Sequence, residues 1–269
     1  MAGPDLFALR TYASRQKPER ISPEVYISHT DTTVAILDRY PKSIFHALVL
    51  PRPRDADGLT VDVLDSLRSL LRSEKAGVSR ETARRILREM GAHAESERER
   101  IRKEMMSRYQ VTWDVWLGFH AVPSMHHLHL HVLSADLHSP TMKHRKHYNS
   151  FHPKRGFFLH YEDVMSWFDA VPSFFKDKAS LDPRTYEPLL KHDLDCFICD
   201  KPFKNMPLLK AHLQQHHEAL YVNKSKSKAP VSKKRALEGG GTPNSKAPTS
   251  SLGSDVKRRK TDSPMSYTI

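Results

Sequence analysis

Long apolar runs, a secretory signal and abundant cysteine are all missing from this sequence. No stretch of about 18 apolar residues occurs, so we expect no membrane-spanning helix. Residues 1–5 lack the basic and apolar blocks of a signal peptide, and only two cysteines are present, Cys196 and Cys199. This composition argues against a disulfide-stapled secreted protein, and we expect an intracellular, reducing setting.

Hydrophobic residues are also scarce. They make up 38% of the 269 residues, and the mean hydropathy is −0.60, so we expect part of the chain to lack a folded core. Most of the net charge of +12 lies in residues 223–269, where 11 Lys and Arg stand against 3 Asp and Glu. This segment is also rich in Ser, Pro and Gly, which predicts a disordered basic tail. Its basic runs at 233–235 and 257–260 are typical of nuclear import signals or nonspecific DNA tethers, so we expect a nuclear location.

The most informative feature that is present is a run of alternating histidines. Three histidines alternate with three aliphatic residues over residues 127–132, and these histidines are His127, His129 and His131. In an extended strand this alternation puts the imidazoles on one face and the aliphatic side chains on the other, against the core. Neutral imidazoles can act as bases, nucleophiles or metal ligands. The run therefore indicates either a metal site or covalent catalysis by the middle histidine.

Residues 127–133 read His-φ-His-φ-His-φ-φ, where φ is apolar. This pattern resembles the motif of the histidine triad family, whose members are nucleotide hydrolases and transferases that use no active-site metal. The resemblance favours covalent catalysis, with His129 as the nucleophile, His127 orienting it, and His131 stabilising charge on the phosphoryl oxygens. Three further positions match the family: His46 near the phosphate, Ser124 three residues before the first triad histidine, and an acidic residue that binds ribose hydroxyls. The acidic residue is Asp38, which follows Leu37 at the end of a predicted strand and forms the nucleotide-binding set with Leu37 and His46.

Strand-like runs at 33–37, 44–50 and 111–119 join the histidine run, and apolar spacing predicts a helix over 61–71. The charged stretch 74–108 is expected to form two helices divided at Gly91. We therefore predict an α+β catalytic domain over residues 23–175, an antiparallel sheet with flanking helices.

Two further segments narrow the resemblance to the aprataxins, the DNA-end deadenylase branch of the family. Residues 118–121 read Gly-Phe-His-Ala, and residues 143–151 contain a Lys…His-aromatic-x-Ser-Phe pattern. In this reading Lys143, Lys146, His147 and Ser150 bind DNA, mostly through its backbone. A solvated basic loop is the alternative.

Residues 1–22 are expected to hold a short amphipathic helix bearing Phe7 and Tyr12. It either packs on the domain or wedges against exposed bases at a DNA end. Because catalytic strands begin near Thr33, we do not expect the forkhead-associated domain of animal aprataxins, so recruitment through phosphorylated scaffolds is not implied.

The last motif, Cys196-x₂-Cys199-x₁₂-His212-x₃-His216, has the spacing of a tetrahedral zinc site. We predict one structural zinc ion in a DNA-binding finger over residues 176–222, with His217 as the competing fourth ligand. A single finger is a poor sequence reader, which favours a sequence-blind DNA clamp.

Taken with the resemblance, these motifs imply an enzyme that removes AMP from 5′-adenylated DNA nicks or breaks through a covalent His129–AMP intermediate. AMP is the product, no metal is expected in the catalytic pocket, and the sequence does not identify repair partners. The alternatives are a general nucleotide or phosphoramidate hydrolase and a noncatalytic zinc-finger protein.

Overall fold

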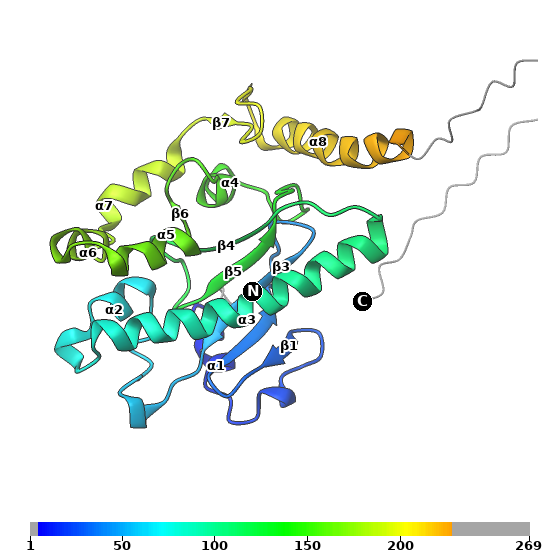
Figure 1. Cartoon of the computed structure of the whole chain (residues 1–269). Helices are drawn as coiled ribbons and strands as arrows, with labels where there is room; N and C mark the ends of the chain where they lie inside the picture. The colour runs from blue at the N-terminus through cyan, green and yellow to red at the C-terminus, as the bar shows by residue number, and fades with distance from the viewer. Residues whose placement is uncertain (1–4, 228–269) are drawn as a thin grey trace, which may run out of the picture. The chain divides into compact units, whose positions relative to one another are not determined.

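Six strands form one antiparallel sheet in the computed structural model, which describes residues 5–227 (Figure 1). In sheet order they are β1 (Tyr26–His29), β2 (Thr33–Leu37), β3 (His46–Pro51), β5 (Leu130–Ser134), β4 (Val115–His120) and β6 (Phe158–His160). A separate hairpin pairs β7 (Leu194–Asp195) with β8 (Pro202–Phe203). The predicted α+β fold, an antiparallel sheet with flanking helices and a zinc-finger module, is confirmed.

Eight α-helices accompany these strands within residues 5–227. They are α1 (Ala8–Ala13), α2 (Leu67–Leu71), α3 (Arg80–Tyr109), α4 (Arg145–Phe151), α5 (Tyr161–Ser166), α6 (Pro172–Lys178), α7 (Pro183–Tyr186) and α8 (Met206–Ser227). Short 3₁₀ turns occupy Pro18–Arg20, Asp55–Asp57, Ser73–Ala76, Trp167–Asp169 and Glu187–Lys191. None of the described helices is long and apolar enough to cross a membrane.

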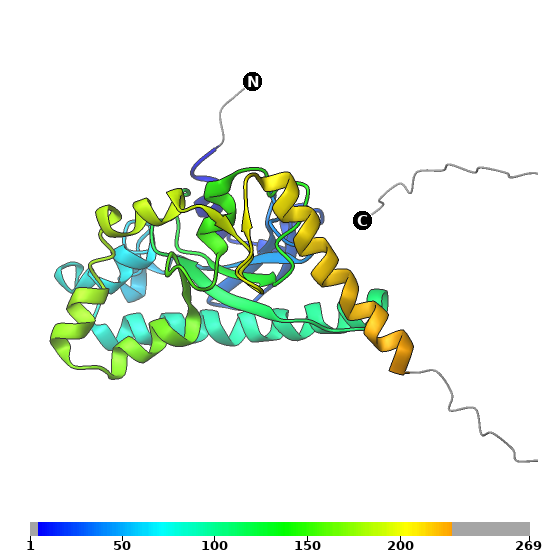
Figure 2. The ribbon, with the colours of Figure 1, turned by 90° about the horizontal axis from the view of Figure 1, so that it is seen from above.

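The two faces of the sheet have different chemistry. One face is apolar and packs against α3, which runs along that side of the sheet in Figure 2. Its residues include Ala47, Val49, Leu117, Leu130 and Val132. Because strand side chains alternate, the opposite face receives the intervening residues of β3, β4 and β5. That face carries the histidines described below.

Helix α3 is continuous across Gly91, so the prediction of two helices divided there was wrong. Ser79 caps its start by accepting a hydrogen bond from the Thr82 N–H, and Gln110 ends it in a left-handed conformation. A Cβ at Gly91 would collide with the Tyr161 ring. This glycine serves close packing against α5 and does not interrupt the helix.

The helix predicted over 61–71 is shorter than expected. Only α2 is helical, and it begins after Ser66, whose hydroxyl accepts a hydrogen bond from the Ser69 N–H. Val63 and Leu64 are nevertheless buried, as the apolar pattern predicted.

The finger segment shares a core with the catalytic domain. Leu133 and Phe158 of the sheet and Tyr148 of α4 lie in one buried cluster with Leu209 and Leu213 of α8. Residues up to Ser227 form a single compact unit, so the expected boundary at 175/176 does not separate two independent cores.

Helix α8 continues to Ser227, which makes residues 223–227 helical where a tail was predicted. Near that end, the Tyr221 hydroxyl lies 2.9 Å from His217 Nε2 one turn earlier in the same helix, and His217 Nδ1 lies 3.2 Å from His138 Nε2 outside the helix. The rest of the predicted tail, including both basic runs, lies outside the described residues, as do residues 1–4.

Candidate active site and zinc centre

The three triad histidines do not share one strand. Strand β5 begins at Leu130, so only His131 lies within it, and the expected arrangement of three imidazoles on one strand face was wrong. His127 adopts a φ of 93°, which is uncommon for a non-glycine residue. The backbone bonds His127 N–H to Asp65 O, 2.9 Å, and Leu128 N–H to Leu64 O, 2.7 Å, hold this turn.

The hydrogen bonds of His129 define its tautomer. Its Nδ1 lies 2.7 Å from the main-chain carbonyl of His127, which can only accept, so Nδ1 carries the proton and Nε2 keeps a lone pair. Burial lowers the pKa of His129, so the ring is neutral near pH 7. His129 is therefore held as a neutral imidazole with a fixed donor and a free nucleophilic nitrogen.

The ring of His127 does not make the orienting contact. Its Nε2–H donates instead to the Pro51 carbonyl at 2.7 Å, and burial lowers its pKa to about 4. In the structure the group that orients His129 is the main chain of His127.

His46 and His131 form a hydrogen-bonded pair on the face of the sheet opposite α3. The Lys42 N–H donates to His46 Nδ1 at 3.1 Å, so His46 Nε2 carries a proton and donates it to His131 Nδ1 at 2.9 Å. This leaves a proton on His131 Nε2, which is buried without a hydrogen-bond partner among residues 5–227. Burial lowers the pKa of His46 to about 4 and that of His131 well below its usual value, so both rings are neutral.

Two residues of this cluster were missed as site residues by the sequence analysis. The His120 ring lies 4.5 Å from that of His131, and burial sets the pKa of His120 well below its usual value. The charge of the half-buried Lys42 further lowers the pKa of His46, His120 and His131. Strand alternation puts His120 on the same face as Gly118, which pairs with His131, so the signal for His120 was available.

The predicted ribose-binding and serine positions lie at the edges of the cluster. Asp38 Oδ2 is 3.6 Å from His46 Nδ1, and the adjoining Leu37 is exposed. Ser124 is exposed in the loop after β4 and lines a surface pocket with Ser66 and Pro123. Ser66 and Pro123 also line the small pocket at His120 and His129, whose lining does not include Ser124.

Helix α1 is docked beside this loop. The His126 N–H donates to the Leu6 carbonyl at 2.9 Å, and Arg10 Nη2 donates to Asp65 Oδ1 at 2.8 Å. The Phe7 ring stacks on His126 with centroids 4.4 Å apart and an angle of 4° between the planes. Phe7 remains 47% exposed next to the site.

Tyr12, the other aromatic residue predicted to meet DNA bases, has a different position. It is half-buried and packs against the cluster that holds Leu9, Ala13 and Ile36. The packing role therefore fits Tyr12, whereas the wedging role remains available only to Phe7.

The predicted DNA-binding segment forms α4 and the turn before it. Lys143 and Lys146 are exposed, and His147 is half-buried. Ser150 is buried, and its hydroxyl donates to the His147 carbonyl at 2.9 Å, so its side chain does not fit the surface contact expected of it. The exposed lysines remain candidates for contact with phosphates.

The predicted zinc ligands converge. Ligand atoms of Cys196, Cys199, His212 and His216 all lie within 4.8 Å of one another. Two thiols and two imidazoles brought together in this way suit a tetrahedral zinc ion, which they would hold. His217 lies instead 3.2 Å from His138 and 2.9 Å from the Tyr221 hydroxyl, so the structure selects His216 as the fourth ligand.

Comparisons with known proteins agree with this architecture. Residues 8–147 match the family described as the scavenger mRNA decapping enzyme C-terminal binding domain, and residues 154–219 match the C2HE / C2H2 / C2HC zinc-binding finger. Aprataxin of Gallus gallus is 35% identical over 196 residues, which cover 72% of this chain and 51% of the relative. The aprataxin-like protein of Saccharomyces cerevisiae is 31% identical over 223 residues, which cover 77% of this chain and 94% of that protein.

A solved structure described as Hnt3 in complex with DNA and guanosine has the same fold. It gives a TM-score of 0.54 at 24% identity, and the match covers 81% of this chain and 97% of that one. The chain spans about half the length of the vertebrate aprataxins that it matches.

The fold and the histidine cluster thus define a histidine triad protein that carries a zinc finger on the same compact unit. Within that class, the chain belongs to the aprataxin family.

Proposed function

We propose that the protein is a DNA 5′-adenylate hydrolase that removes AMP from abortive ligation intermediates at DNA breaks. The observation that carries this proposal is the state of His129, a neutral ring whose Nδ1–H is fixed on the His127 carbonyl. This arrangement leaves Nε2 free to attack phosphorus, the role of a nucleophile oriented by a third group.

In the first step His129 Nε2 bonds to the AMP phosphorus while the P–O bond to the DNA 5′-phosphate breaks. The departing phosphate takes the electron pair. Water then attacks the same phosphorus, the P–N bond breaks, and AMP and a proton are released. Dividing one difficult displacement into two easier ones is the general advantage of covalent catalysis.

Hydrogen-bond donors around the cluster stabilise the developing charge. The unpaired Nε2–H of His131 is a donor for a phosphoryl oxygen, and the charge of Lys42 acts on the same ring. Ser124 contributes its hydroxyl, and His46 holds His131 in the tautomer that donates. Fixed donors directed at developing charge supply much of the catalysis in such transfers.

The product AMP is held by Asp38 at its ribose hydroxyls and by Leu37 at its base. This pocket works without a metal ion. Although Asp38, His46 and His131 could offer three ligand atoms, both nitrogens of His46 are already engaged with Lys42 and His131. The protein binds one zinc ion, in the finger.

The partner is DNA with a 5′-adenylated nick or break. Three features support this assignment: the finger fused to the catalytic unit, the exposed Lys143 and Lys146, and a relative of the same fold whose structure is described in complex with DNA and guanosine. Lysines of this kind bind phosphates without reading sequence. A nuclear location is part of the proposal, and it is supported only by the basic runs at 233–235 and 257–260, whose sequence is typical of nuclear import signals or nonspecific DNA tethers.

The substitution His129→Ala tests the mechanism. We expect AMP release from a 5′-adenylated nick to fall at least about a thousandfold, because the nucleophile is lost. Acid-quenched wild-type protein should carry radiolabelled AMP, and the variant should carry none. His192→Ala is the matched control, since His192 is exposed on the finger side of the molecule. Turnover by His129→Ala at the wild-type rate would contradict covalent catalysis and leave the noncatalytic DNA-binding interpretation.

A further inference from the structure

Helix α4 lies between the two sites described above. Tyr148, at the middle of the helix, contacts the segment around the zinc ligand Cys196, and Phe151, at its end, contacts the catalytic histidines. Both side chains are buried. No role for this short helix beyond its exposed lysines follows from the proposed chemistry.

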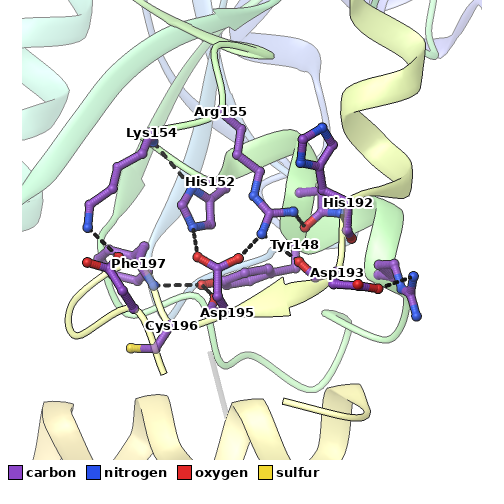
Figure 3. Close-up of polar contacts among 12 residues, drawn as sticks. Tyr148, His152, Lys154, Arg155, His192, Asp193, Asp195, Cys196 and Phe197 are labelled. Carbon is purple, nitrogen blue, oxygen red and sulfur yellow. Dashed lines mark hydrogen bonds and ion pairs between the residues drawn. The ribbon is translucent and has the colours of Figure 1, made fainter. Parts of the chain in front are cut away.

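At the finger end, the Tyr148 hydroxyl is fully engaged by backbone on both sides of Cys196 (Figure 3). It donates to the Asp195 carbonyl at 2.7 Å and accepts from the Phe197 N–H at 3.0 Å. A phenol, with an ordinary pKa of about 10, keeps at neutral pH the proton that it donates. One side-chain oxygen therefore fixes the backbone that presents a metal-binding thiol.

Neighbouring contacts reinforce this attachment. Asn149 Nδ2 donates to the carbonyls of Leu190, 3.0 Å, and His192, 2.8 Å, while its Oδ1 accepts from Arg155 Nη1 at 2.6 Å. Arg155 also donates to the Asp193 carbonyl at 2.6 Å and pairs with the Asp195 carboxylate, as Figure 3 shows. The segment before Cys196 is thereby bound to α4 and to Arg155 by several hydrogen bonds and an ion pair.

At the catalytic end, Phe151 forms one wall of the histidine cluster. Its ring lies 4.5 Å from that of His120, 5.1 Å from that of His131 and 5.4 Å from that of His46. Any rotation or shift of α4 would move these rings, because packed interiors transmit small displacements.

We propose that Tyr148 is a positioning residue that links the Cys196 segment to the catalytic histidines through α4. The finger then has a second role besides DNA contact: when its metal is bound, it fixes the register of α4 and so the orientation of His120 and His131. The catalytic part of this inference rests on the proposed deadenylase function, whereas the structural link does not.

The experiment compares three zinc-loaded variants of the full chain: Tyr148→Phe, Phe151→Leu, and Tyr26→Phe as the matched control. Tyr26 also loses a hydroxyl hydrogen bond, to His29, at the far edge of the sheet. Zinc release to a chromogenic chelator is measured at the finger end, and the imidazole ¹⁵N resonances of His120 and His131 are measured at the catalytic end. The ring of His93, which bonds to Thr33 on the opposite side of the sheet, is the internal reference.

If α4 links the two sites, Tyr148→Phe and Phe151→Leu should each change both zinc release and the imidazole resonances, because coupling between sites is reciprocal. Tyr148→Phe should speed zinc release about tenfold, the effect usual for residues that orient metal ligands, and should also shift the His120 and His131 resonances. Phe151→Leu should shift those resonances and also speed zinc release. Tyr26→Phe should change neither. If each variant changes only its own end, or if both ends match the wild type, the link is refuted.

Kinetics then test the catalytic consequence. On a 5′-adenylated nick, Tyr148→Phe should lower kcat about tenfold with KM unchanged, since misplaced groups slow the chemistry more than they weaken binding. A rise in KM alone would assign Tyr148 to DNA contact and refute the positioning role. If wild-type protein releases no AMP from the nick, the proposed function fails, and the zinc and imidazole measurements still decide whether Tyr148 links the two sites.

Discussion

Replacing His127 by asparagine should change how stability depends on pH. His127 is fully buried, and burial lowers its pKa from 6.5 to about 4. In the unfolded chain the ring binds a proton as the pH falls through about 6.5, whereas in the folded chain it resists doing so until about pH 4. Between these values the unfolded state holds more protons, so stability is complete above pH 6.5 and is lost as the pH falls toward 4.

The size of the effect follows from the shift. A decrease of about 2.5 pKa units corresponds to about 3 kcal/mol in total, of which about 2 kcal/mol is lost between pH 7 and pH 5. Asparagine has no proton to gain in this range. The free energy of unfolding of His127→Asn should therefore fall by about 2 kcal/mol less than that of the wild type over the same interval.

Urea unfolding at pH 7 and pH 5 measures this difference directly. Other acid-sensitive terms, including loss of zinc, act on both proteins and cancel in the comparison. His192→Asn, which makes the same substitution at an exposed histidine, is the matched control. Equal losses for His127→Asn and the wild type, within about 0.5 kcal/mol, would refute the assignment of His127 as a buried neutral ring.

Two other perturbations test the packing. A Cβ at Gly118 would lie 2.7 Å from the Leu159 carbonyl, so Gly118→Ala should lower the free energy of unfolding by about 1–3 kcal/mol, as overpacked cores do. Gly156→Ala, at a φ of 76° with open space around the site, should cost only about 1 kcal/mol, and equal costs would contradict the steric argument. Chelating the zinc should lower the melting temperature while calorimetry still shows one transition, because Leu209 shares a buried cluster with Leu133; a separate finger transition would contradict the shared core.

Local patterns in the sequence predicted much of this protein. The alternating histidines, the cysteine and histidine spacing, and the strand runs depend on short-range periodicity. Accordingly, the antiparallel sheet is confirmed and the four expected zinc ligands converge. The likeness of residues 127–133 to the histidine triad motif likewise indicated the family to which the chain belongs.

What failed depends on contacts between distant residues. The alternation of residues 127–131 predicted a strand, but backbone bonds to Leu64 and Asp65 hold residues 127 and 128 in a turn. Those partners are more than sixty positions away along the chain. Gly91 looked like a helix break because its role, making room for the Tyr161 ring, involves a residue seventy positions later.

Two other features also depend on contacts between distant residues, so the sequence did not predict them. They are the effect of Lys42 on the histidine cluster and the core that the finger shares with the catalytic domain. Lys42 follows a proline in a turn that looked like an ordinary connection, and only the folded chain shows that its charge acts on three histidines. From the sequence, Tyr148 was recognised only as the aromatic residue of the pattern at 143–151. Its hydrogen bonds could not be predicted, because the backbone that its hydroxyl binds lies almost fifty residues further on.

The most direct test of the central claim offers the purified protein two substrates at equal concentration, a 5′-adenylated nicked duplex and an AMP–lysine phosphoramidate. AMP release is followed for the wild type and for His129→Ala. We predict a much larger kcat/KM for the nick, with no release from either substrate by the variant. Equal or faster release from the phosphoramidate would make the protein a general nucleotide hydrolase and contradict its assignment to DNA ends.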